Sequence, residues 1–81
     1  MRPFEQAEVE LLCLRLEPRL RAGYRVEAEP ADELWELRFE LHGLRHRLKL
    51  DPLYIEDCLD RGDCGHLQEL LDEVCHFLEG R

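Results

Sequence analysis

The seventeen residues from Leu34 to Leu50 constrain the fold most, because they fit two different structural periods. As a helix, the segment has a leucine seam at heptad spacing, formed by Leu34, Leu37, Leu41, Leu44 and Leu48. That helix would point Trp35, Phe39 and Leu50 into water. As a β-hairpin turning at His42-Gly43, the segment gathers its apolar residues and one histidine on a single inner face: Trp35, Leu37, Phe39, Leu41, Leu44, His46, Leu48 and Leu50. We therefore predict the hairpin, whereas a helix here would make the whole protein all-α.

The register of this hairpin follows from pairing Leu41 with Leu44 across the turn. On the outer face of the sheet, this register creates two pairs of opposite charge and one of like charge: Glu40 with Arg45, Glu36 with Lys49, and Arg38 with Arg47. Pairs of opposite charge stabilise neighbouring strands, and the like pair costs a little. The charges therefore support the predicted register.

A further strand is expected at residues 24–29, where apolar and charged side chains alternate before Pro30. A turn over residues 30–33 would place this strand beside the hairpin, with Val26 next to Leu37. The sheet is then a three-stranded antiparallel meander.

Helices are expected on both sides of the meander in the sequence. Residues 4–17 repeat apolar side chains at helical spacing. Asp51 and Pro52 suit the cap and first position of a second helix that ends at Gly62, and Asp63 is expected to cap a last helix running to Gly80. The prediction is one small domain over residues 1–81: an α+β two-layer sandwich of order α-β-β-β-α-α, with the helices on one face.

Several classes of function are excluded by composition, since the chain contains no Ser, Thr or Asn. A Ser or Thr nucleophile, a phosphate-binding loop ending in Lys-Ser/Thr and an N-glycosylation acceptor all require these residues. No stretch resembles a signal peptide or a membrane span. We therefore expect a cytoplasmic protein that makes no use of a membrane, and whose cysteines are reduced thiols.

The net charge of minus eight is concentrated in the C-terminal part of the chain. Residues 51–81 carry nine acids against Arg61 and Arg81, which gives minus seven. The acids expected on the outer faces of the last two helices are Glu56, Asp57, Asp60, Glu69, Asp72, Glu73 and Glu79. One interpretation is a solvated face that keeps the protein soluble. The other is a binding surface for a basic protein, as in an inhibitor, an antitoxin-like protein or a nucleic-acid mimic.

The clustered cations lie on the outer sheet face, where Arg45, Arg47 and Lys49 lie near Arg38. Four cations are few for direct binding of nucleic acid. The same face is compatible with an acidic segment or with a second copy of the chain, so a homodimer is among the predictions.

The cysteines and histidines near the C-terminus form the densest chemical cluster, with Cys58, Cys64, His66 and Cys75 as its members. Sulfur and imidazole suit zinc, but the spacing lacks a close pair of ligands. Buried thiols are the favoured interpretation, and a zinc- or redox-responsive module is the alternative. Cys75 and His76 are adjacent on a helix, so they diverge and cannot act as nucleophile and base. We therefore expect no enzyme and no cofactor.

Overall fold

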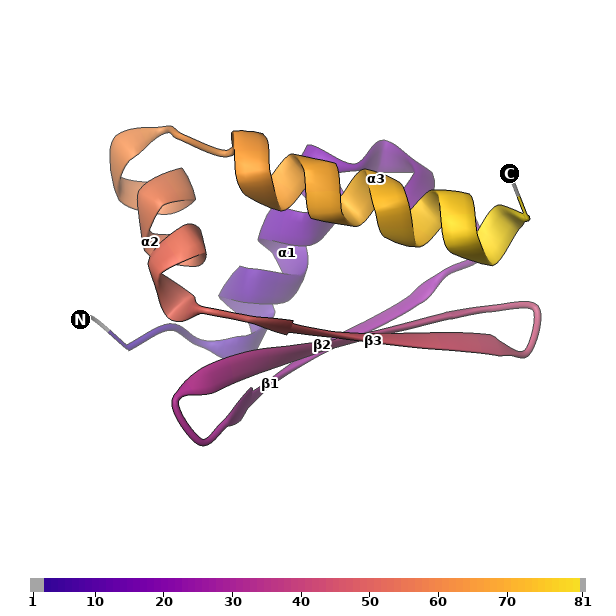
Figure 1. Cartoon of the computed structure of the whole chain (residues 1–81), viewed down its shortest axis with the longest axis horizontal. Coiled ribbons are helices and arrows are strands. Elements are labelled where there is room, and N and C mark those ends of the chain that lie inside the picture. Colours follow the sequence, from indigo (N-terminus) through magenta and orange to yellow (C-terminus); the bar gives the residue numbers. More distant parts are fainter. Residues whose placement is uncertain (1–2, 81) are drawn as a thin grey trace.

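The protein folds into two layers, as seen in a computed structural model that describes residues 3–80. The α-helices cover one side of a three-stranded antiparallel sheet, and no part of the described chain covers the other side (Figure 1). The elements in chain order are α1 (Gln6–Leu16), the short 3-10 helix η1 (Pro18–Arg21), β1 (Arg25–Ala31), β2 (Leu34–Leu41), β3 (Leu44–Leu50), α2 (Pro52–Arg61) and α3 (Gly65–Glu79). The predicted α+β sandwich of order α-β-β-β-α-α is confirmed.

The hairpin of β2 and β3 has the predicted register, with Leu41 opposite Leu44. His42 and Gly43 form its turn with φ angles of 51° and 82°. Two positive φ angles in succession are typical of the tight turn that matches the twist of a hairpin, and glycine adopts such an angle without steric cost. The pairs Glu40–Arg45, Glu36–Lys49 and Arg38–Arg47 follow as predicted.

The pairing of β1 with β2 differs from the prediction by two residues. Val26 lies opposite Phe39 rather than Leu37, and Ala28 takes the place beside Leu37. The difference arises because β1 continues through Pro30 to Ala31, so that the turn contains Asp32 and Glu33 alone. A shift of two residues leaves every side chain on its predicted face.

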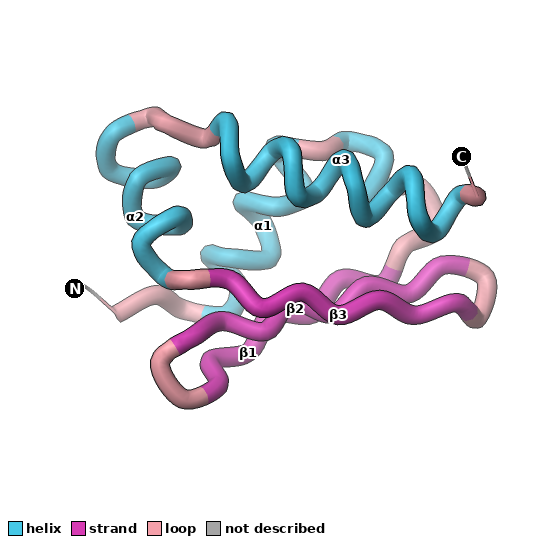
Figure 2. Tube along the Cα trace, viewed as in Figure 1, coloured by secondary structure: helices cyan, strands magenta, loops and turns pink. Residues whose placement is uncertain are grey.

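The hydrophobic core lies between the inner sheet face and the helices, the two layers drawn in magenta and cyan in Figure 2. Helix α1 packs against β1, and α3 packs across β2 and β3. The inner face contributes side chains that are at most 6% exposed, namely Trp35, Leu37, Phe39, Leu41 and Leu50. Leu44, which we predicted to face the core, is 56% exposed because it lies beside the turn at the end of the sheet.

The helix ends follow the predicted capping at α2 but not at α3. Asp51 accepts a hydrogen bond from the backbone N–H of Leu53 at 2.9 Å, and Gly62 ends α2 in the left-handed conformation. Asp63, however, does not cap α3, which begins one residue later than that role requires. Its backbone N–H instead donates to the carbonyl of Asp57 at 3.0 Å and completes the end of α2. The first helix is also shorter than predicted, because the chain leaves it at Glu17 and forms η1 from Pro18.

Candidate protein-binding surfaces

The acidic helix surface, as we call the seven carboxylates predicted to bind a partner, lies on α2 and α3. Its members are Glu56, Asp57, Asp60, Glu69, Asp72, Glu73 and Glu79. The opposite side of α3 is buried in the core through Leu67, Leu71, Val74, Cys75 and Leu78. Glu69 and Glu73 are exposed one helical turn apart, so the amphipathic pattern of α3 directs them outward.

Some of these carboxylates are engaged within the protein. Asp57 pairs with Arg61 at 2.8 Å, one turn along α2. Asp72 accepts a hydrogen bond from the Arg19 guanidinium, and Glu79 accepts one from the Tyr24 hydroxyl at 2.5 Å. The ion pairs of Asp57 and Asp72 with arginine reduce the charge that the acidic helix surface offers to a partner.

Arg19 forms a contact with the acidic helix surface that the sequence pattern does not predict. It donates to Glu17 at 2.6 Å as well as to Asp72, and so ties η1 to α3. The hydrogen bond from Arg19 lowers the pKa of Glu17, and both carboxylates raise the pKa of Arg19. The sequence motif Glu17-Pro18-Arg19 indicates the local pair, but no spacing rule connects it to Asp72, 53 residues away.

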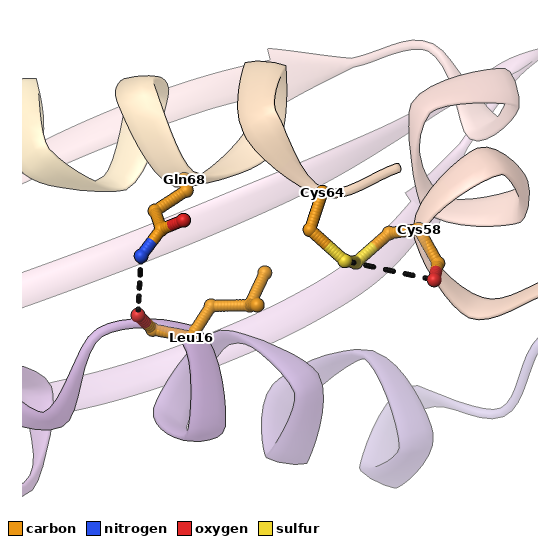
Figure 3. The surroundings of a disulfide bond; sticks show 4 residues. All are labelled: Leu16, Cys58, Cys64 and Gln68. Atoms are coloured by element: carbon orange, nitrogen blue, oxygen red, sulfur yellow. Dashed lines mark hydrogen bonds between the residues drawn. A yellow bond between two sulfur atoms is a disulfide. The ribbon is translucent and has the colours of Figure 1, made fainter. Parts of the chain in front are cut away.

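The four members of the cysteine and histidine cluster do not lie together as a set of ligands. Cys58 and Cys64, which we expected as reduced thiols, are joined by a disulfide (Figure 3). Gly62 turns the chain back between them, so that their Cα atoms lie 4.3 Å apart. His66 stacks on Tyr54 with ring centroids 4.2 Å apart, and Cys75 is buried in the core. Within residues 3–80, no group of three or more His, Cys, Asp or Glu side chains is placed to hold a metal ion.

The disulfide lies at the corner where α2 meets α3. Close by, the side-chain amide of Gln68 donates to the carbonyl of Leu16 at 3.4 Å and links α3 to the end of α1 (Figure 3). The Cys64 sulfur lies 3.6 Å from the carbonyl oxygen of Cys58. A disulfide sulfur has no hydrogen to donate, so only a reduced Cys64 thiol can form a hydrogen bond with this carbonyl.

The two free cysteines are buried and stay protonated at neutral pH. Burial, with a smaller contribution from the nearby Glu10 carboxylate, raises the pKa of Cys13 to about 12. Burial also raises the pKa of Cys75. The thiolate is the nucleophilic form of cysteine, so neither side chain is activated for attack on a substrate.

The outer sheet face, as we call the uncovered side of the sheet, carries three charged residues from each strand. From β1 to β3 they are Arg25, Glu27 and Glu29; Glu36, Arg38 and Glu40; and Arg45, Arg47 and Lys49. Arg38 at the centre donates to Glu29 at 2.9 Å and to Glu27 and Glu36 at 3.1 Å. These hydrogen bonds offset the repulsion between Arg38 and Arg47. They also raise the pKa of Arg38, with Glu29 as the larger cause and Glu27 as the next.

A shallow hollow of about 580 Å³ lies on this outer sheet face, lined mainly by arginine and glutamate side chains. It has no apolar wall suited to a small organic ligand. Of the four cations singled out in the sequence, Arg38 is paired with three acids, and Arg47 approaches Glu36 at 3.9 Å. In the part of the chain that the structure describes, Arg45 and Lys49 form no ion pair.

His46, the histidine predicted on the inner face, is half-buried and contacts Phe77 of α3 with ring centroids 4.9 Å apart. Phe77 itself is 63% exposed. No sequence pattern connects these two residues, because Phe77 lies outside the apolar stripe of α3.

Comparison with known proteins adds no functional information: no protein family, curated protein or solved structure matches this chain. Across residues 3–80, no helix has the length and apolar character needed to cross a membrane. Any assignment of function therefore rests on the surfaces described above.

Proposed function

We propose that the protein is a small, non-catalytic interaction module of the cytoplasm that binds a basic partner through the acidic helix surface. The observation that carries this proposal is the net charge of minus seven on residues 51–81, whose α3 members Glu69 and Glu73 are directed away from the core. Like charges one turn apart repel by a few tenths of a kcal/mol, so they are retained at a small cost in stability. An inhibitor, an antitoxin-like protein or a nucleic-acid mimic would use such a surface to attract a basic partner.

A double charge reversal tests this proposal, with Glu69→Lys and Glu73→Lys combined. Asp72 is left unchanged because it holds Arg19 within the fold. We expect the reversal to weaken capture of basic proteins from the native host by about tenfold or more, since both attraction and steering are lost. The measurement is a quantitative pull-down at physiological salt.

The matched control reverses two exposed acids far from α3 in the sequence, Glu5→Lys with Glu33→Lys, and so produces the same change in net charge. Capture should persist in this control. If the two double variants retain the same partners, the acidic helix surface is not the binding site.

A second candidate function is redox response, which the disulfide between Cys58 and Cys64 favours. Disulfides in the cytoplasm are usually transient and catalytic or redox-sensing. Two protein thiols and one oxidised glutathione would exchange to give the protein disulfide and two reduced glutathione molecules, with two electrons passing to glutathione. The exchange would tighten or loosen the corner between the two acidic helices.

Reduction should lower the free energy of unfolding by about 2 kcal/mol, the value expected for opening a closed loop of this size. Urea unfolding of oxidised and reduced protein measures the difference, and Cys58→Ala should be insensitive to reductant. Thiol titration under denaturing conditions should find two more thiols in the reduced sample. Equal titration of the two samples would rule out the redox candidate.

A further inference from the structure

The backbone groups on the free edge of β3 can be identified from the turn that precedes it. Leu41 and Leu44 flank a two-residue turn and therefore form a hydrogen-bonded pair, and such pairs alternate along an antiparallel ladder. His46 and Leu48 consequently direct their backbone groups toward β2. Arg45, Arg47 and Lys49 direct theirs toward the free edge.

The same rule can be checked on β1. Ala31 and Leu34 flank the turn of Asp32 and Glu33, so Ala28 should direct its N–H away from β2. It does so: this N–H donates to the Glu10 carboxylate of α1 at 2.9 Å. The alternation therefore predicts edge groups correctly in this sheet.

The β1 edge is closed to an added strand at two of its three outward-facing residues, Ala28 and Pro30. Glu10 occupies the N–H of Ala28, and Pro30, which also faces outward, has no N–H to offer. The β3 edge differs, since across residues 3–80 no hydrogen bond reaches the backbone of Arg45, Arg47 or Lys49 from outside the sheet.

The side chains along the β3 edge are cationic on one side of the sheet and apolar on the other. On the outer sheet face, Arg45, Arg47 and Lys49 form a cationic row with side chains about 6.8 Å apart, twice the rise of a strand. On the other side lie the exposed apolar groups of Leu44 and Phe77, with the ring of His46 in tilted contact with Phe77. A strand added here would meet cations at every second residue and apolar groups at the residues between.

We propose that β3 accepts an extended peptide segment as a fourth, antiparallel strand, and that this segment alternates acidic with apolar residues. Strand addition is an established mode of peptide recognition, in which backbone hydrogen bonds give affinity and alternate side chains give specificity. The acidic residues pair with the cationic row, and the apolar residues cover Leu44 and Phe77. This surface is separate from the acidic helix surface, and the inference does not depend on the function proposed above.

Two other occupants fit the β3 edge less well. Antiparallel pairing with β3 of a second copy, centred on Arg47, would oppose Arg47 to Arg47 and Arg45 to Lys49, and like charges directly opposite are destabilising. A nucleic-acid backbone would meet Glu36 and Glu40 on the same face as the cations. An acidic strand added at the edge avoids both costs. Its acids lie opposite the cations, and it pairs with β3 rather than lying over Glu36 and Glu40 of β2.

The test uses a fluorescein-labelled heptapeptide that alternates Glu and Val, titrated with the full chain and followed by fluorescence anisotropy. A peptide that alternates Lys and Val should bind at least about tenfold more weakly. Residues opposite Arg45, Arg47 and Lys49 exchange hydrogen bonds with them, and these residues are the glutamates. N-methylation of the glutamates should therefore weaken binding about tenfold or more, whereas N-methylation of the valines, whose N–H groups face away, should change it less than about twofold.

Two protein variants complete the experiment. Arg47→Glu should weaken binding of the Glu–Val peptide about tenfold. Arg25→Glu, a charge reversal on the same face but at the closed β1 edge, should leave it within about twofold. The fluorescence of the buried Trp35 verifies that both variants are folded.

Several results would overturn the inference. They are no binding at roughly 1 mM peptide, equal effects of the two N-methylation patterns, or equal effects of Arg47→Glu and Arg25→Glu. Displacement of the peptide by a short oligonucleotide at physiological salt would instead assign the face to nucleic acid. A dimer in sedimentation that Arg47→Glu dissociates would assign it to a second copy.

Discussion

Strands β1 and β3 flank the same central strand in the same antiparallel arrangement. Their free edges nevertheless differ in which backbone groups are available for hydrogen bonds. The β1 edge is closed by the Glu10 carboxylate and by Pro30. The β3 edge carries free backbone groups beside a row of three cations. Proline and charge are both known protections of sheet edges against pairing. Proline excludes every added strand, whereas charge excludes only a strand of like sign, so the difference between the edges determines which strand each one admits.

The largest expected effect comes from the strand that both edges share. Phe39→Ala removes the ring of a fully buried residue in the middle of β2 and should lower the free energy of unfolding by about 3–5 kcal/mol. Leu44→Ala, at a position that is 56% exposed, should cost less than about 1 kcal/mol. Urea unfolding measures both variants. Similar losses for the two would show that the core does not lie where the structure has it.

The next effect is expected at alkaline pH and should first loosen α1, the helix whose Glu10 closes the β1 edge. The pKa of the Cys13 thiol on α1 is raised from 9.0 to about 12, and the pKa values of Cys75 and Tyr24 are raised as well. Above pH 9 the unfolded chain loses the Cys13 proton while the folded protein keeps it. Stability should therefore fall as pH rises, by about 1.4 kcal/mol per pH unit between about 9 and 12 from this thiol alone.

Urea unfolding at several pH values with Cys13→Ala separates this contribution, because the variant should lose stability less steeply. Since α1 supplies Glu10, loosening of α1 should also speed amide exchange at Ala28. A pH dependence that is identical in the wild type and Cys13→Ala would contradict the assignment.

The smallest effect concerns the closure of β1 itself. Glu10→Ala removes the acceptor of the Ala28 N–H and should cost about 1–2 kcal/mol, within the range for leaving a buried donor without its hydrogen-bond partner. Leu11→Ala changes the neighbouring, 65% exposed side chain of the same helix and serves as the control. Unchanged stability together with unchanged exchange at Ala28 would show that Glu10 does not close this edge.

The sequence predicted the layers, the hairpin and the faces of the strands, because side-chain alternation and the His42-Gly43 turn are local signals. The prediction was wrong at Pro30, where proline was read as a strand end although the strand continues. An edge strand tolerates proline wherever the missing N–H faces away from its neighbour. The register of β1 then followed from a turn two residues shorter than expected.

For the candidate surfaces, the sequence predicted which face each charged residue occupies but not which contacts it makes in the folded protein. The acids and cations could be assigned to helix and sheet faces from periodicity alone. The partners of Asp72 and Glu79 could not, because Arg19 and Tyr24 reach them only in the folded chain. The disulfide was missed because the expected cytoplasmic location argued for reduced thiols, although Gly62 brings Cys58 and Cys64 together at the corner of α2 and α3.

Amide hydrogen exchange of the free protein tests the contrast between the two edges most directly. We expect the amides of Arg45, Arg47 and Lys49 to exchange quickly, because they face solvent, and those of His46, Leu48 and Ala28 to exchange slowly, because they donate hydrogen bonds within the fold. Addition of the Glu–Val peptide should then slow Arg45, Arg47 and Lys49 and leave Ala28 unchanged. Protection of Arg47 equal to that of Ala28 in the free protein would contradict the account.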